Sequence, residues 1–200
     1  MHSKLPERWY KIFRPILGLI FKFYYHPKII GKENIPKNGP IIVVGNHIHL
    51  MDQCGAIIST KRVIHYMAKK EYFDGRHRWF FKMTGCISVN RSIHDDDAKK
   101  AALDVLDDGK ALGLFPEGTR NKTDAFLLPF KFGAVSMAKK MDAYLVPFAV
   151  TGNYKFRSKN LVYRFGKPFK VTNMELAEAN RRLFKVIGDL KRKSLSEEKR

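Results

Sequence analysis

The sequence has few cysteines and no long apolar run, and each lack excludes a class of protein. Cys54 and Cys86 are its only cysteines, which excludes a disulfide-stapled secreted fold and favours a reducing, intracellular setting. The N-terminal region is the most apolar, but its uninterrupted stretch, Pro15 to Phe21, has only seven residues. A transmembrane helix needs about 20 predominantly apolar residues, so we predict no spanning helix. The short run, with no small-x-small cleavage site after it, also argues against a signal peptide.

Acidic residues are also scarce: 19 Asp and Glu stand against 38 Lys and Arg, which gives a net charge of +19. With 44% hydrophobic and 12% aromatic residues, the composition is that of a globular protein and not of a disordered or fibrous one. The positive charge indicates an anionic partner, which could be nucleic acid, a membrane surface or a phosphorylated substrate. Because we find no aromatic-interleaved motif of the kind that single-strand binders use, we expect no nucleic-acid partner.

Cations interrupt the apolar N-terminal stretch WYKIFRPILGLIFKFYYHPKII at Lys11, Arg14 and Lys22. This mixture is typical of a helix that lies in a membrane interface, where aromatic rings sit at headgroup depth and cations meet anionic lipid. The same apolar residues would equally serve a helix that packs on the rest of the protein. The sequence leaves both interpretations open.

From residue 40 onward, short apolar runs alternate with segments of helical pattern. Strands are expected at 40–46, 62–69, 86–90, 111–116, 143–150 and 160–170, and helices near 51–60, 75–85, 95–106, 132–142 and from a capping box of Thr172 and Glu175 onward. This alternation predicts an α/β fold, a single domain over residues 29–200 with a mainly parallel central sheet flanked by helices. Residues 1–28 would form an N-terminal amphipathic helical segment for membrane association.

Polar residues follow three of the expected strands directly: Asn46-His47, Asn90-Arg91 and the segment 117–120. In parallel sheets, ligands bind at the carboxyl ends of the strands. We therefore expect the three groups to share one edge of the sheet and to form one site.

His47 and Asp52 could be a base and its orienting partner. Five steps of about 100° would place two side chains of one helix roughly 140° apart, so they could not pair as helix neighbours. They could pair if His47 lies in the loop after a strand and Asp52 lies in the first turn of the next helix. A carboxylate that accepts the Nδ1 proton leaves Nε2 free as a base. Two alternatives stay open: Asp52 as a simple helix cap, and His49 as the base.

The stretch FPEGTR could bind a phosphate group. Gly118 permits close approach of the backbone, Thr119 offers a hydroxyl, and Arg120 offers a guanidinium that can make bidentate contacts. A plain turn is the alternative. Arg91 could add a second positive charge at the same edge, or it could instead pair with one of the acids at 95–97.

No protein nucleophile is evident. Cys54 and Cys86 lie among apolar neighbours, which is typical of core residues. A base without a protein nucleophile indicates that the substrate supplies its own, for example a hydroxyl that attacks an activated acyl group.

Taken in order, NHIHLMD, GCISVNR, FPEGTR and VPFAV resemble the four blocks of the glycerolipid acyltransferase family, especially the 1-acyl-sn-glycerol-3-phosphate (lysophosphatidic acid) acyltransferases. The similarity runs from about residue 30 to residue 170. It implies transfer of a fatty acyl group from a thioester of acyl-carrier protein or coenzyme A to the sn-2 hydroxyl of a lysophospholipid, usually lysophosphatidic acid. The product would be phosphatidic acid for phospholipid synthesis, formed with no metal, other cofactor or covalent intermediate. Another lipid acceptor and a non-catalytic basic membrane-binding module are the alternatives.

The resemblance also implies roles for individual residues. His47 would be the general base and Asp52 its orienting partner. The second and third blocks would hold the glycerol phosphate, through Gly85, Arg91, Glu117, Gly118, Thr119 and Arg120. The acyl site would be supported by Val146, Pro147, Val150 and again Gly85. The expected location is the cytoplasmic face of the cell membrane, peripheral or monotopic, with an anionic membrane surface as partner.

Overall fold

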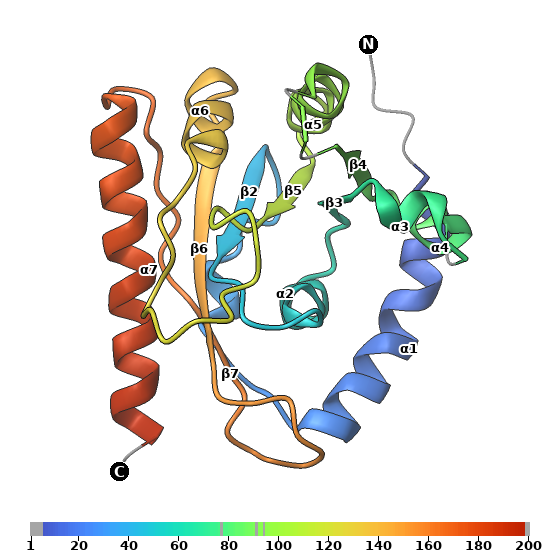
Figure 1. Cartoon of the computed structure of the whole chain (residues 1–200), viewed down its shortest axis with the longest axis vertical. Coiled ribbons are helices and arrows are strands. Elements are labelled where there is room, and N and C mark those ends of the chain that lie inside the picture. The colour runs from blue at the N-terminus through green and yellow to red at the C-terminus, as the bar shows by residue number, and fades with distance from the viewer. Residues whose placement is uncertain (1–5, 77, 91, 94, 199–200) are drawn as a thin grey trace.

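The apolar run after Pro40 forms β2 (Ile41–Gly45), the central strand of the sheet. The computed structural model describes residues 6–76, 78–90, 92–93 and 95–198, and the strand order within them is β1-β7-β6-β2-β5-β3-β4 (Figure 1). Every neighbouring pair runs parallel except β6 and β7. The other strands are β1 (Lys28–Ile30), β3 (Ile64–Lys69), β4 (Ile87–Val89), β5 (Ala111–Leu114), β6 (Tyr144–Thr151) and β7 (Val162–Phe165). The predicted α/β fold with a mainly parallel sheet is confirmed.

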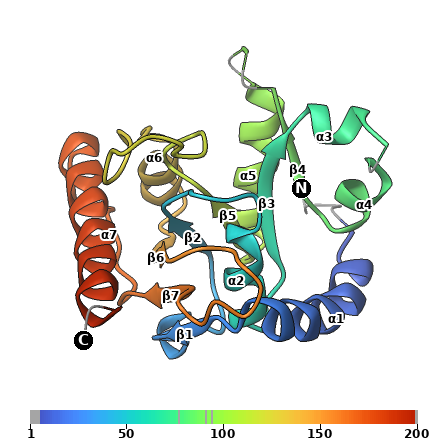
Figure 2. The same cartoon turned by 60° about the horizontal axis from the view of Figure 1, so that its bottom comes forward.

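Helices cover both faces of this sheet, as Figure 2 shows. Ile42 and Val44 of β2 share one core with the helices of the first face, and Ile41 and Val43 share a second core with those of the other face. Alternate residues of β2 thus pack into two different cores, one on each face of the sheet. Both sets of residues are therefore apolar, and the strand is a continuous apolar run in the sequence. The first face carries α5 (Asp96–Asp107), α6 (Gly133–Lys140) and α7 (Leu176–Glu198), and the second carries α1 (Arg8–Tyr25) and α2 (Asp52–Ser59). Connections contain the short η1 (Lys32–Asn34), α3 (Glu71–Asp74) and α4 (Arg78–Met83).

The N-terminal helix α1 has two apolar faces. Its inner face includes Tyr10 and Phe21, which are 5% and 1% exposed, and the helix packs against α2. Its outer face exposes Trp9, Ile12, Ile16, Leu19, Ile20 and Phe23 to solvent. The helix therefore packs on the protein, as one of the two interpretations expected, and it also presents an exposed apolar surface. Within the described residues, no helix has the length and apolar character that crossing a membrane requires.

Some local expectations differ from the structure. Thr172 does not open the last helix, because residues 172 and 173 form a turn and α7 begins only at Leu176. In that turn the Thr172 hydroxyl donates to Asp142 Oδ1 at 2.6 Å. The helix expected at 75–85 is limited to α4, since Gly75 is extended and ends the preceding α3.

Candidate active site

His47 and Asp52 meet across the turn between β2 and α2. The strand ends at Gly45 and the helix begins at Asp52, so His47 lies in the intervening loop. His47 Nδ1 lies 2.8 Å from Asp52 Oδ2. The Asp52 side chain is fully buried, whereas that of His47 is 14% exposed, which leaves the imidazole within reach of a substrate. The pairing that the spacing allowed is present.

Asp52 also holds the backbone of the loop. The N–H groups of Ile48 and His49 donate to Oδ2 at 2.7 and 2.8 Å, beside the bond from His47. The alternative of a simple helix cap is wrong, because Asp52 is the first residue of α2 and its side chain accepts from N–H groups that precede the helix. The carboxylate organises the residues that precede its helix, and it is the partner of His47.

His49 has different surroundings. Its Nδ1 accepts a hydrogen bond from Met51 N at 3.2 Å, and its ring stacks on Tyr154 with centroids 4.1 Å apart. An Nδ1 that accepts places the ring proton of neutral His49 on Nε2, by inference from the hydrogen bonds. His49 therefore has the opposite tautomer from the one that Asp52 imposes on His47.

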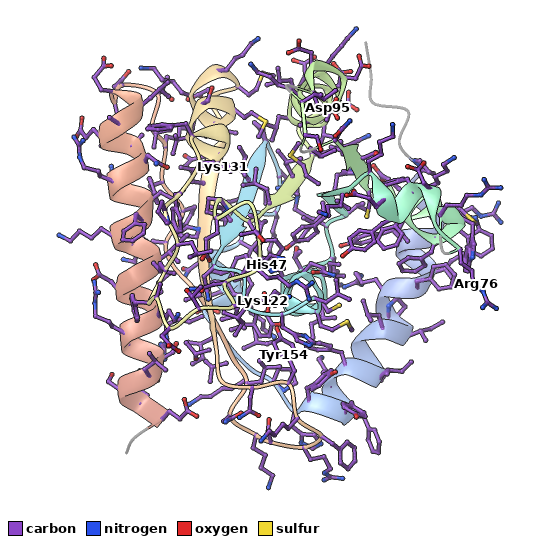
Figure 3. The ribbon with its side chains drawn as sticks, viewed as in Figure 1. His47, Arg76, Asp95, Lys122, Lys131 and Tyr154 are labelled. Atoms are coloured by element: carbon purple, nitrogen blue, oxygen red, sulfur yellow. The ribbon has the colours of Figure 1, made fainter. Side chains whose placement is uncertain are left out.

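The FPEGTR loop wraps around the backbone of His47. Glu117 Oε1 accepts from His47 N at 2.8 Å, and Asn121 N donates to His47 O at 2.7 Å. The Phe115 ring stacks on the imidazole, with centroids 4.0 Å apart and planes 8° from parallel. The first and third sequence groups are thus in contact, as their positions after parallel strands predicted (Figure 3 places His47 at the centre of the view). The second group was expected at the same site, but the contacts of Asn90 are with Asp95 and Ser92, and Arg91 is outside the described residues.

Both carboxylate oxygens of Glu117 bind backbone. Oε1 accepts from His47 and Oε2 accepts from Leu128 N at 2.9 Å, and the residue is only 4% exposed. Burial raises the pKa of Glu117 above its ordinary value, although both N–H donors act in the opposite direction. Glu117 therefore ties the His47 loop to the segment that follows FPEGTR.

Gly118 adopts a left-handed conformation with φ of 70°. A Cβ built there would lie 2.8 Å from Lys131 Cε, so the Lys131 side chain lies directly over this glycine. Thr119 is exposed and Arg120 is half-buried on the same loop, and Arg91 lies outside the described residues. Lys131 was not predicted from the sequence, because it lies in the segment PFKFG, which contains no recognisable motif.

The asparagines of the first two groups hold backbone. The Asn46 amide, fully buried, donates to Val150 O at 3.0 Å and accepts from Val150 N at 2.8 Å. Asn90 N donates to Asp95 Oδ2 at 2.7 Å, and the Asn90 side chain accepts from Ser92 N at 3.0 Å. Both residues shape the carboxyl ends of their strands.

The residues expected to support an acyl site are dispersed. Val146 and Val150 lie in the core against which Phe115 packs, on the same face as the His47 ring. Pro147 points to the other face, where a Cβ on Gly166 would lie 3.2 Å from its Cγ. Gly85, with φ of 72°, lies before the start of β4, at the end opposite to the one that Asn90 follows.

Tyr154 contacts Asp52, and no sequence motif predicted this contact. Its hydroxyl donates to Asp52 Oδ1 at 2.5 Å from the loop between β6 and β7. It is separated from Asp52 by 102 residues and belongs to none of the quoted motifs. Only the folded chain brings the two together.

Comparison with known proteins gives consistent matches. A family model described as "Acyltransferase" matches residues 26–151. A 1-acyl-sn-glycerol-3-phosphate acyltransferase of Bacillus subtilis is 33% identical over 148 residues, which covers 72% of this chain and 71% of that protein. One of Borreliella burgdorferi is 32% identical over 148 residues, with 69% of this chain covered but only 56% of that protein. The chain therefore spans little more than half of some relatives.

The fold also matches a solved structure. The crystal structure of a 1-acyl-sn-glycerophosphate acyltransferase from Thermotoga maritima aligns with a TM-score of 0.76 at 23% identity, over 96% of this chain and 80% of that one. The family model covers more than half of the chain, and both sequence blocks that meet at His47 lie within its range. The chain belongs to the acyltransferase family.

Proposed function

We propose that this protein is a 1-acyl-sn-glycerol-3-phosphate O-acyltransferase, which transfers a fatty acyl group from an acyl thioester to the sn-2 hydroxyl of lysophosphatidic acid and forms phosphatidic acid. The observation that carries the proposal is the His47–Asp52 pair, 2.8 Å apart and bound to the FPEGTR loop through Glu117. The names of the Bacillus and Borreliella relatives support the same reaction.

His47 acts as the general base. Because an ionised carboxylate only accepts hydrogen bonds, the proton of neutral His47 lies on Nδ1 and Nε2 carries the free lone pair. Nε2 removes the proton of the acceptor hydroxyl while its oxygen attacks the thioester carbonyl. A C–O bond forms, the C–S bond breaks, and the imidazolium returns the proton to the departing thiolate. In this scheme no metal or other cofactor takes part besides the thioester co-substrate.

Two neighbours stabilise the imidazolium while it exists. The buried Asp52 carboxylate provides a negative charge 2.8 Å from Nδ1. The Phe115 ring presents its face 4.0 Å from the imidazole centroid, a position that favours a cation. Both contacts gain strength when the ring becomes charged, so they lower the barrier to proton transfer.

The FPEGTR loop binds the phosphate of the acceptor in this proposal. Thr119 and Arg120 supply a hydroxyl and a guanidinium, and Lys131 adds a cation above Gly118. Glu117 contributes by holding the loop, and Arg91 of the second block is assigned to the same phosphate. Val146 and Val150 support the acyl chain on the His47 face, while Pro147 and Gly85 act through the framework.

The reaction is tested with a panel of acceptors and donors. Purified protein is given lysophosphatidic acid, lysophosphatidylethanolamine or lysophosphatidylglycerol, each with an acyl-coenzyme A or an acyl-carrier protein thioester, and products are read by mass spectrometry. We expect phosphatidic acid in at least one donor arm. Product from another lysophospholipid alone would retain acyl transfer and change the acceptor. No acylated product from any combination would overturn the proposal.

We infer that the protein works at the cytoplasmic face of an anionic membrane, as a peripheral or monotopic protein. Residues 1–28 would be its membrane-association segment and 29–200 its acyltransferase domain. The support is the outer face of α1, where Leu19 and Phe23 are 74% and 64% exposed, together with the net charge of +19. An apolar helix face gains free energy in the interface, and the cations are attracted to anionic lipid.

Membrane association is tested with a double variant, Leu19→Glu with Phe23→Glu. Flotation with vesicles of phosphatidylglycerol and phosphatidylcholine should show at least about tenfold weaker binding, since two apolar side chains no longer enter the interface. Leu176→Glu is the control, because Leu176 is exposed at the start of α7 on the other face of the sheet. Equal binding by the double variant and the control would contradict the inference.

A further inference from the structure

Asp52 receives its hydrogen bonds very unequally. Oδ2 accepts three, all from residues 47–49 of the preceding loop. Among the described residues, the donor recorded for Oδ1 is the Tyr154 hydroxyl, at 2.5 Å. Since Asp52 is fully buried, solvent water cannot reach Oδ1 and replace this donor. The Tyr154 hydroxyl thus holds Oδ1, the carboxylate oxygen that the loop does not bind.

The direction of this hydrogen bond follows from proton counting. Tyr154 has a single hydroxyl proton, and it is donated to Asp52 because an ionised carboxylate can only accept. The Tyr163 hydroxyl lies 2.5 Å from that of Tyr154 and 3.4 Å from Met51 O, so its single proton is donated to the much nearer Tyr154 oxygen. Burial raises the pKa of both phenols far above the ordinary value, so both remain protonated donors. A chain of two hydroxyls therefore ends at the carboxylate that pairs with His47.

The Tyr154 ring is fixed by its neighbours. It stacks on His49 at 4.1 Å, with the planes 21° apart. On α1, the rings of Phe21 and Tyr25 meet it edge-on, at 6.5 and 5.4 Å between centroids. The hydroxyl is thus held in place before any substrate binds, and Figure 3 shows Tyr154 near His47 in the view. The packing also gives His49 a role that is independent of base catalysis.

We propose that Tyr154 is a positioning residue for the acyl transfer: its hydroxyl fixes the rotation of the Asp52 carboxylate so that Oδ2 faces His47 Nδ1. This inference rests on the proposed function of the His47–Asp52 pair. Rotation about the Cβ–Cγ bond moves both oxygens, so the bond to Oδ1 adds to the resistance of the three bonds at Oδ2. Without it the carboxylate rotates more easily, and each rotation carries Oδ2 away from His47 Nδ1. Tyr163 supports the same arrangement one step further away, through its bond to Tyr154.

The first test compares Tyr154→Phe with Tyr144→Phe. The first substitution removes the hydroxyl and keeps the packed ring. The second is a matched control, because Tyr144 is the first residue of β6, at the amino end of the strand and away from Tyr154, and is 41% exposed. We expect Tyr154→Phe to lower kcat about tenfold, the loss of one hydrogen bond to a charged group. KM for both substrates should stay within about twofold, because Tyr154 touches neither in this scheme. Equal kcat for the two variants would overturn the proposal.

A second variant separates positioning from mere packing. Tyr154→4-aminophenylalanine keeps the ring and restores an N–H donor at the position of the hydroxyl. Its kcat should be close to that of the wild type and well above that of Tyr154→Phe. If Tyr154→Phe fails to fold, the comparison with the wild type is the test. A folded 4-aminophenylalanine variant with no recovery of kcat would contradict the proposal.

A spectroscopic readout keeps this inference separate from the proposed reaction. The Nδ1 proton of a histidine held by a carboxylate resonates downfield of the amide protons, and its shift depends on the hydrogen bond. This resonance should move or vanish in Tyr154→Phe and stay in place in Tyr144→Phe, whether or not lysophosphatidic acid is a substrate. An unchanged resonance in Tyr154→Phe would refute the positioning role. Absence of acyl transfer by the wild type would refute only the proposed function.

Discussion

Glu117→Gln tests whether the FPEGTR glutamate acts through the backbone of His47. Each carboxylate oxygen of Glu117 accepts one N–H, from His47 at 2.8 Å and from Leu128 at 2.9 Å. Glutamine has only one oxygen, so either orientation leaves one N–H facing an amide NH₂. The substitution keeps the shape of the side chain and removes one of the two bonds.

The magnitude follows from burial. At 4% exposure, a lost hydrogen bond with an unsatisfied N–H costs about 1–3 kcal/mol. Part of this free energy is recovered, because glutamine carries no charge to bury. Burial raises the pKa of Glu117, which means that its charged form is disfavoured in the folded state. A net loss of about 1–2 kcal/mol lowers the Tm of a domain of this size by about 2–8 °C. Displacement of His47 by a fraction of an ångström should lower kcat about 10- to 100-fold.

The assay is steady-state kinetics with lysophosphatidic acid, together with thermal unfolding. Glu175→Gln is the control, since Glu175 is exposed before α7. We expect Glu117→Gln to reduce kcat and Tm together, with a smaller change in KM for the acceptor. A KM raised tenfold with unchanged kcat and Tm would show instead that Glu117 contacts the substrate directly.

Three further results are expected. Arg120→Gln should raise KM for lysophosphatidic acid about tenfold and leave that for a neutral lysolipid nearly unchanged, and equal increases would contradict its phosphate role. Gly118→Ala should destabilise the protein by about 1–2 kcal/mol in urea unfolding, because φ of 70° strains an L-residue; an unchanged midpoint would refute this. Burial raises the pKa of Cys54 to about 12, so unfolded Cys54 ionises first and native stability falls as pH rises from about 8.5 towards 12. The free energy of unfolding should fall less between pH 8 and pH 10 in Cys54→Ala than in the wild type, and an equal fall would contradict this; part of the fall remains, because burial also raises the pKa of Cys86.

The fold could be predicted because its signals are local. Ile41 to Val44 form a continuous apolar run, which a strand buried on both faces requires. Asp95 caps α5 as expected, with Ala98 N donating to its side chain at 2.9 Å. The capping box at Thr172 was wrong because residues 172 and 173 form a turn before α7, in which the Thr172 hydroxyl donates to Asp142, 30 residues away in the sequence.

The site was predictable only where its residues lie close to a strand end. His47 and Asp52 are five residues apart, so geometry across one turn was enough to pair them. Tyr154 and Lys131 reach the site from loops that nothing in their own sequence relates to His47. The backbone role of Glu117 was also hidden, because a motif gives the type of a side chain and not the direction in which it points.

The most direct test of His47 as the base is His47→Asn. The asparagine amide can still donate towards Asp52, so the loop and the Tm should be preserved while the basic Nε2 is lost. Phosphatidic acid formation by the wild type and the variant is measured under saturating substrates. We predict a loss of about 10³-fold or more in kcat with a Tm within about 2 °C of the wild type. A folded variant that retains more than a tenth of the wild-type rate would contradict the role of His47.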